Sequence, residues 1–86
     1  MKILKFYADW CTPCKLLNSV ITRYHGDIDI EDIDVEQNSS LADQYKIEDL
    51  PTCIIVDQQG NEVERIVGMM TLYEFASFVE SSRSTL

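Results

Sequence analysis

Alternating and fully apolar stretches of the chain predict four β-strands. Residues 2–7 alternate weakly and are rich in Ile, Leu, Phe and Tyr, whereas residues 53–57 are apolar on both faces. The turn sequence of residues 58–61 leads from the latter into residues 62–67, which predicts a hairpin. Residues 28–35, rich in Ile and Asp, are predicted to form the remaining strand.

Two of these strands carry charged residues on apolar faces. Side chains alternate between the two faces of a strand, so Asp32 in the 28–35 strand shares a face with Ile28 and Ile30. Lys5 likewise lies on the same side of its strand as two apolar or aromatic neighbours. Both charges are therefore candidates for specific roles.

Apolar residues at helical spacing predict a long helix over residues 12–24. Pro13 suits its first turn and Gly26 provides a stop signal. A shorter helix is expected over residues 39–45, capped by the two serines with which that segment begins.

A third helix begins at a capping box formed by Thr71 and Glu74. The polar residues from Ser81 onward predict a frayed tail. The element order is strand, helix, strand, short helix, strand, strand, helix, which predicts a four-stranded α/β fold in a single domain over residues 1–86. One face of the last helix is apolar: Leu72, Phe75, Ala76 and Val79.

Composition and charge exclude several classes of partner. With 86 residues, 45% hydrophobic and 26% charged, the chain is expected to form one small globular domain. The net charge of −8 repels nucleic acid phosphates and anionic lipids alike. No apolar run reaches the roughly 18 residues of a membrane span, and no signal-peptide core is present. We therefore expect a cytoplasmic monomer that binds neither nucleic acid nor membranes.

Two cysteines lie at the junction of the first strand and the long helix, in the sequence Cys11-Thr-Pro-Cys14. In a reducing compartment such a pair is more often catalytic or metal-binding than structural. Unpaired backbone N–H groups and the helix dipole favour an anion at a helix start, so we expect Cys11 to be an accessible thiolate with a pKa below about 8.5. Cys14, one turn inside the helix on its buried side, would then resolve a mixed disulfide on Cys11.

A zinc site is the alternative for this cysteine pair. A structural zinc ion takes four ligands, and beyond the pair the chain offers only Cys53 and His25, which are distant in sequence. Dithiol chemistry without a metal is therefore preferred. Cys53 is most simply a small buried residue, with a regulatory thiol as the alternative, and His25 is expected at the surface.

Residues 8–15, Ala-Asp-Trp-Cys-Thr-Pro-Cys-Lys, resemble the active-site segment of the thioredoxin family. The tripeptide 50–52, Leu-Pro-Thr, is similar to the family's Ile-Pro-Thr, and Gly68 to the glycine beside its substrate groove. The resemblance implies a thioredoxin-like fold, with a mixed four-stranded sheet, helices on both faces and the third strand antiparallel to the first. The chain resembles a short member, without the N-terminal strand and helix of longer ones.

The resemblance also implies roles and partners. Cys11 would be the nucleophile and Cys14 the resolving thiol, forming a redox-active disulfide with no bound cofactor. Pro51 would be a cis-proline that leaves the backbone of Thr52, or of its neighbour, free to pair with a client strand. Thioredoxin reductase would supply electrons to reduce disulfides in client proteins, of which ribonucleotide reductase is one example. The implied substrate-binding residues are Trp10, Thr12, Pro13, Pro51, Thr52 and Gly68.

Three positions depart from the family pattern. Thr12 replaces the usual Gly, so the redox potential is expected to differ, and its hydroxyl is a candidate donor to the Cys11 thiolate. Lys5 falls where the family buries an Asp, and Asp32 where it places a Lys. We expect a partly buried Lys5–Asp32 ion pair whose cation favours thiolate, with Lys15 as a further tuning group. The alternative is that Lys5 extends to solvent.

The sequence thus predicts a thiol-disulfide oxidoreductase that reduces protein disulfides. A glutathione-dependent glutaredoxin is one alternative, although Trp10 before the first cysteine and the absence of tyrosine between the two cysteines argue against it. A binding subunit with incidental thiols is the other, because a fold alone does not determine function.

Overall fold

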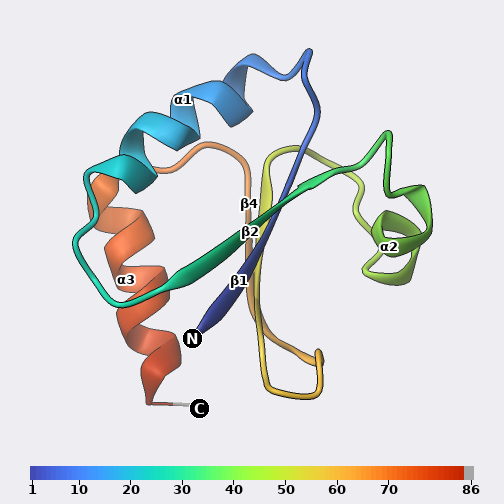
Figure 1. Cartoon of the computed structure of the whole chain (residues 1–86). Helices are drawn as coiled ribbons and strands as arrows, with labels where there is room; N and C mark the ends of the chain where they lie inside the picture. The colour runs from blue at the N-terminus through green and yellow to red at the C-terminus, as the bar shows by residue number, and fades with distance from the viewer. Residues whose placement is uncertain (85–86) are drawn as a thin grey trace.

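The computed structural model describes residues 1–84 and shows a four-stranded sheet between helices (Figure 1). The sheet is mixed, as predicted, because it contains both parallel and antiparallel strand pairs. No helix among the described residues has the length and hydrophobicity needed to cross a membrane. The elements are β1 (Lys2–Tyr7), α1 (Thr12–Thr22), β2 (Asp29–Asp34), α2 (Ser39–Gln44), β3 (Thr52–Val56), β4 (Glu62–Val67) and α3 (Leu72–Arg83).

Strand β1 lies at the centre of the sheet, between β2 and β3. It pairs in parallel with β2 and antiparallel with β3, as the family resemblance implied, and β3 pairs antiparallel with β4. The register places Lys5 opposite Asp32 on one side and opposite Cys53 on the other. This register brings the two charged residues that the alternation pattern singled out into direct proximity.

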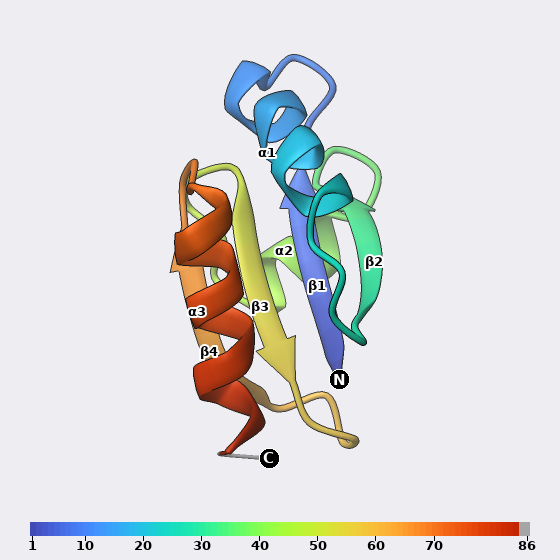
Figure 2. The same ribbon diagram turned by 90° about the vertical axis from the view of Figure 1, so that its left-hand side faces the viewer.

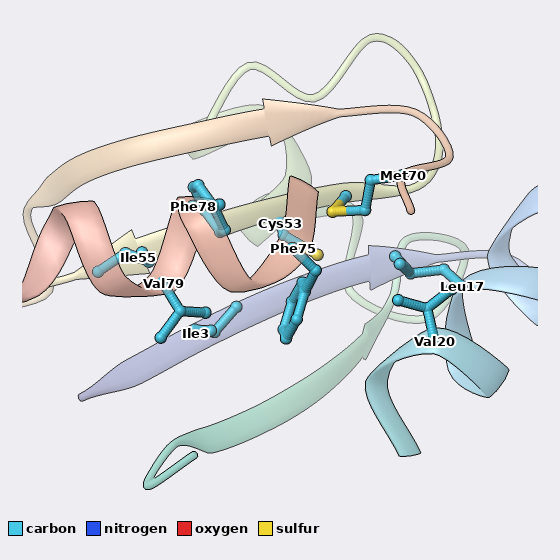
Figure 3. Packing of buried hydrophobic residues seen from close by; sticks show 9 residues of the cluster. All are labelled: Ile3, Leu17, Val20, Cys53, Ile55, Met70, Phe75, Phe78 and Val79. Atoms are coloured by element: carbon cyan, nitrogen blue, oxygen red, sulfur yellow. The ribbon is translucent and has the colours of Figure 1, made fainter. Parts of the chain in front are cut away.

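Each face of the sheet has its own hydrophobic core. Helices α1 and α3 cover one face and α2 lies on the other (Figures 1 and 2). Ile28 and Ile30 pack on the side of α1 and α3 and Ile33 on the opposite side, which confirms the predicted alternation of β2. The core beneath α1 and α3 (Figure 3) contains Ile3, Leu17, Val20, Cys53, Ile55, Met70, Phe75, Phe78 and Val79.

Two helix boundaries differ from the prediction. Helix α1 ends at Thr22 rather than Tyr24, because the amides of Arg23 and Tyr24 bond to carbonyls three residues earlier, each at 3.0 Å, and so tighten the last turn. The N-cap of α2 is Asn38 rather than a serine, and Ser39 is already helical.

The predicted fraying from Ser81 is wrong for most of that segment. Helix α3 continues to Arg83, whose guanidinium donates to the carbonyl of Asp27 at 2.9 Å. Ser82 is buried and its hydroxyl donates to the carbonyl of Phe78 at 2.8 Å. Contacts with the α1–β2 connection therefore stabilise a polar segment that local sequence alone does not favour. The remainder of the predicted tail, residues 85–86, lies outside the described residues.

The capping box at the start of α3 is present, with Glu74 N–H donating to the Thr71 hydroxyl at 3.1 Å and Thr71 N–H to the Glu74 carboxylate at 2.8 Å. We expect Thr71→Ala to lower the free energy of unfolding by about 1 kcal/mol, because a helix N–H loses its acceptor. Urea denaturation measures this change. Ser77→Ala, at an exposed position of the same helix, is the control and should be neutral or slightly stabilising.

Candidate active site

Cys11 and Cys14 form a disulfide at the start of α1, with their Cα atoms 5.3 Å apart. The amide of Cys11 donates to the carbonyl of Ala8 at 3.1 Å, which turns the chain from β1 into the helix. Cys11 is the N-cap, and its Sγ accepts the backbone N–H of Cys14 at 3.2 Å. Pro13 lies in the first turn, where its missing N–H costs no helical hydrogen bond. The predicted position at the positive end of the helix is thus confirmed.

Both cysteines of the disulfide are buried. Cys14 is 2% exposed, as predicted, but Cys11 is only 4% exposed, so the expected accessibility of Cys11 is wrong for the disulfide form. The cause is packing, because the pair joins Ala8 in a small cluster. Access to the disulfide is therefore through the surface that borders this cluster. The side chains packed against it are Tyr7, Val35 and Leu50.

An open groove of about 390 Å³ lies beside the disulfide cluster. Val35 and Leu50 line this groove and also pack against the cluster, so the groove borders the cluster of the two cysteines. Trp10, which also lines the groove, is 68% exposed. Of the groove residues, the sequence singled out Trp10 as a substrate-binding residue and Leu50 as the first residue of the Leu-Pro-Thr motif. The groove is lined by Trp10, Val35, Ala42, Ile47, Glu48, Asp49 and Leu50.

The second motif lies at the start of β3. The Leu50–Pro51 peptide bond is cis, as the resemblance implied. The carbonyl of Pro51 accepts the N–H of Gly68 at 2.7 Å, and Gly68 has a positive φ of 90°, which favours glycine. Pro51 and Gly68, which are far apart in the sequence, are thus joined directly.

The remaining predicted contact residues differ in exposure. Thr12 and Pro13 are exposed beside the disulfide. Thr52 is 1% exposed, and its hydroxyl donates to the carbonyl of Asp49 at 2.6 Å. A client therefore has no direct access to the Thr52 side chain in this structure. The bond from Thr12 to a Cys11 thiolate stays a prediction, because Cys11 is here in a disulfide.

Lys5 and Asp32 form the predicted ion pair. Lys5 Nζ lies 2.8 Å from Asp32 Oδ1, and the two side chains are 6% and 58% exposed. The alternative, in which Lys5 extends to solvent, is therefore wrong. Lys5 Nζ also donates to Asn18 Oδ1, a partner that sequence reasoning missed although Asn18 follows Cys14 by one helical turn. Lys15, the other predicted tuning group, is exposed.

The thioredoxin family model matches residues 1–81, a span that includes the disulfide, the cis-proline and Gly68. The chain belongs to the thioredoxin family. It is 33% identical over 84 residues to a thioredoxin of Staphylococcus epidermidis, covering 93% of this chain and 80% of that relative.

Solved thioredoxin structures share the fold. A mutant thioredoxin from Halobacterium salinarum is 32% identical, has a TM-score of 0.83, and the match covers 94% of this chain and 73% of that one. A thioredoxin from Malassezia sympodialis has a TM-score of 0.77 at 24% identity, with 94% and 74% covered. The family, together with a disulfide at the Cys-x-x-Cys position, makes this chain a protein-disulfide oxidoreductase.

The third cysteine of this thioredoxin-family chain lies apart from the disulfide. Cys53 is fully buried in β3, which confirms the expected small interior residue. Burial raises the pKa of the Cys53 thiol to about 12, and the positive charge of Lys5 opposes this rise only in part. Cys53 therefore keeps its proton at neutral pH.

We expect the oxidised protein to show no reactive thiol under native conditions and one in denaturant, because Cys53 is its only free cysteine. An aromatic disulfide reagent, read by absorbance, measures both values. The Cys53→Ala variant should show no thiol in either condition. Rapid reaction of a full thiol in the native protein would contradict the burial argument.

Within residues 1–84, no group of three or more His, Cys, Asp or Glu side chains is placed to hold a metal ion. His25 is exposed, as expected.

Proposed function

We propose that this chain is a cytoplasmic electron donor that reduces disulfides of client proteins. The observation that carries the proposal is the Cys11–Cys14 disulfide at the N-terminus of α1, bordered by an open groove. In the reduced chain, the N–H of Cys14 and the helix dipole favour a thiolate at Cys11 over one at a typical surface cysteine.

The reaction proceeds by two thiol-disulfide exchanges. The Cys11 thiolate attacks one sulfur of the client disulfide, forms a mixed disulfide, and releases the other client sulfur as a thiolate. Cys14, once deprotonated, attacks Cys11 Sγ, so the Cys11–client bond breaks and its electron pair leaves with the client sulfur. The client gains two electrons and two protons, and the chain is left with its Cys11–Cys14 disulfide.

The groove beside the cysteines is proposed to receive the client segment. Trp10 contributes a large exposed side chain to its lining, and Thr12 and Pro13 are exposed beside the disulfide. The side chain of Pro51 is buried, so Pro51 and Gly68 are proposed to shape the backbone at this border through their mutual hydrogen bond. A monomer is sufficient for this chemistry.

A thioredoxin reductase that uses NADPH is the proposed source of electrons, and ribonucleotide reductase is one proposed client. The test supplies the oxidised chain either with a thioredoxin reductase and NADPH or with glutathione, glutathione reductase and NADPH. Insulin serves as the disulfide substrate, and NADPH consumption is measured. We expect the first system to be faster by at least about tenfold. Equal or faster turnover with glutathione would overturn the proposal in favour of a glutaredoxin.

A further inference from the structure

Lys5 is a buried cation that the exchange steps above do not use. Its side chain is 6% exposed and its ammonium has three neighbours from three different elements. It pairs with Asp32 of β2 at 2.8 Å, donates to Asn18 of α1, and lies 5.9 Å from the centroid of the Tyr7 ring on β1. These contacts hold the charge between the sheet and the helix that carries the disulfide.

Two of these contacts connect the ammonium to the surroundings of Cys14. Asn18 follows Cys14 by four residues in α1, so the two side chains lie on one face with Cβ atoms about 5–6 Å apart. Cys11, seven residues before Asn18, lies a further turn away along the helix. Tyr7, the third neighbour of Lys5, packs directly against the cluster of the two cysteines. The cation is therefore nearer along the helix to the resolving sulfur than to the attacking one.

The other groups around Lys5 do not cancel its charge. Burial raises the pKa of the Tyr7 phenol, to which Asp34, Asp9 and Asp32 add, so Tyr7 is neutral at neutral pH. Cys53, opposite Lys5 on β3, is a neutral thiol.

Asp32 is the anion in direct contact with Lys5, and its side chain is much more exposed to solvent than that of Lys5. Its side chain is 58% exposed against 6% for Lys5. Solvent and salt therefore screen the carboxylate more strongly than the ammonium. We therefore expect the carboxylate to offset the field of the ammonium only in part on the side of α1.

We propose that Lys5 is a positioning residue for the resolving step, whose ammonium stabilises the thiolate of Cys14, while Asp32 limits that stabilisation. The inference rests on the proposed function for its role in turnover. In the mixed disulfide, the proton of Cys14 passes to solvent and the thiolate attacks Cys11 Sγ. The Cys11–client bond then breaks, and the client thiolate that departs takes up a proton. Lys5 donates no proton and forms no bond in this sequence.

The test titrates Cys14 in a Cys11→Ser background, where the disulfide cannot form. Thiolate absorbance in the ultraviolet follows the titration, and Cys53 ionises only at strongly alkaline pH. We expect Lys5→Met to lower the Cys14 thiolate fraction at pH 7 about tenfold, because an opposite charge is lost near the sulfur. Asp32→Asn should raise it by about threefold, since the partial neutralisation of Lys5 is removed. A purely structural role does not predict opposite signs.

Lys2→Met is the matched control. Lys2 pairs with Glu31 at 2.9 Å, also between β1 and β2, but both side chains are about half exposed, and Lys2 lies at the start of β1. This substitution makes the same change in net charge and should leave the titration unchanged. An unchanged titration in folded Lys5→Met, or shifts of the same sign in Lys5→Met and Asp32→Asn, would overturn the inference.

If Lys5→Met does not fold, the titration of Asp32→Asn alone tests the inference. A Cys14 thiolate fraction at pH 7 that does not rise in Asp32→Asn rejects it. The titration uses neither a client nor a reductase. A failure of the proposed function would instead appear as lost insulin reduction with the titration behaving as expected.

Discussion

Replacing Cys11 with serine is expected to lower the rate of insulin reduction that the chain catalyses by on the order of 10³-fold or more, with dithiothreitol as the reductant. Cys11 is the N-cap of α1. A thiolate there accepts a hydrogen bond from the N–H of Cys14 and is stabilised by the positive end of the helix dipole. A serine hydroxyl in this position does not ionise at neutral pH and cannot exchange with a disulfide. Turbidity of the precipitating insulin chains measures the rate.

Replacing Cys14 with serine has a different consequence. The first exchange still occurs, but the second sulfur is missing, so the client remains bound to Cys11. A non-reducing gel should show this mixed disulfide, and dithiothreitol should release it. Cys53→Ala is the control and should retain activity, because Cys53 is buried in the core beneath α1 and α3 and not in the cluster of the two cysteines. In the insulin assay described above, wild-type activity of the Cys11→Ser variant would instead indicate that the chain is a binding subunit with incidental thiols.

Phe75→Ala should lower the free energy of unfolding by about 3–5 kcal/mol. Phe75 is fully buried in the core beneath α1 and α3 (Figure 3). Its ring packs edge-on against that of Tyr24, two residues after the end of α1, with centroids 5.4 Å apart. Its removal takes apolar surface out of the core and leaves a cavity in a domain whose total stability is expected at about 5–15 kcal/mol. Urea denaturation followed by far-ultraviolet circular dichroism measures the change.

Tyr73→Ala is the matched control for Phe75→Ala. Tyr73 lies in the same helix but is 81% exposed, so a change of about 0.5 kcal/mol or less is expected. Similar losses in the two variants would mean that helix propensity, rather than core packing, determines the result.

Alternation and fully apolar runs were sufficient to predict all four strands, although not every strand boundary. Around β2, for example, Ile28, just before the strand, and Ile30 lie on the side of α1 and α3, while Ile33 lies on the opposite side. The end of α3 could not be predicted in the same way. Ser82 is polar and locally unfavourable as a core residue, but its hydroxyl finds an acceptor one turn earlier and the helix end is tied to Asp27.

The candidate site likewise has features that the sequence predicted and features that it did not. The spacing of Cys11 and Cys14 at a strand–helix junction was enough to predict the disulfide chemistry, because helix geometry and the helix dipole are local properties. The burial of Cys11 was not predictable, since it depends on packing by residues distant in sequence, including Val35 and Leu50. The groove beside the pair arises from the same long-range packing.

By itself, the sequence determined the number and order of the elements, the alternation of the strand at Ile30 and Ile33, and the pair of reactive sulfurs, since each follows from periodicity or from spacing within a few residues. For Lys5 it left two states open, a buried ion pair and an extended side chain. Folding selected the buried one, because strand register sets Lys5 beside Asp32 and helix packing brings Asn18 over it. Such a choice depends on three separate elements meeting in space, which no local pattern records.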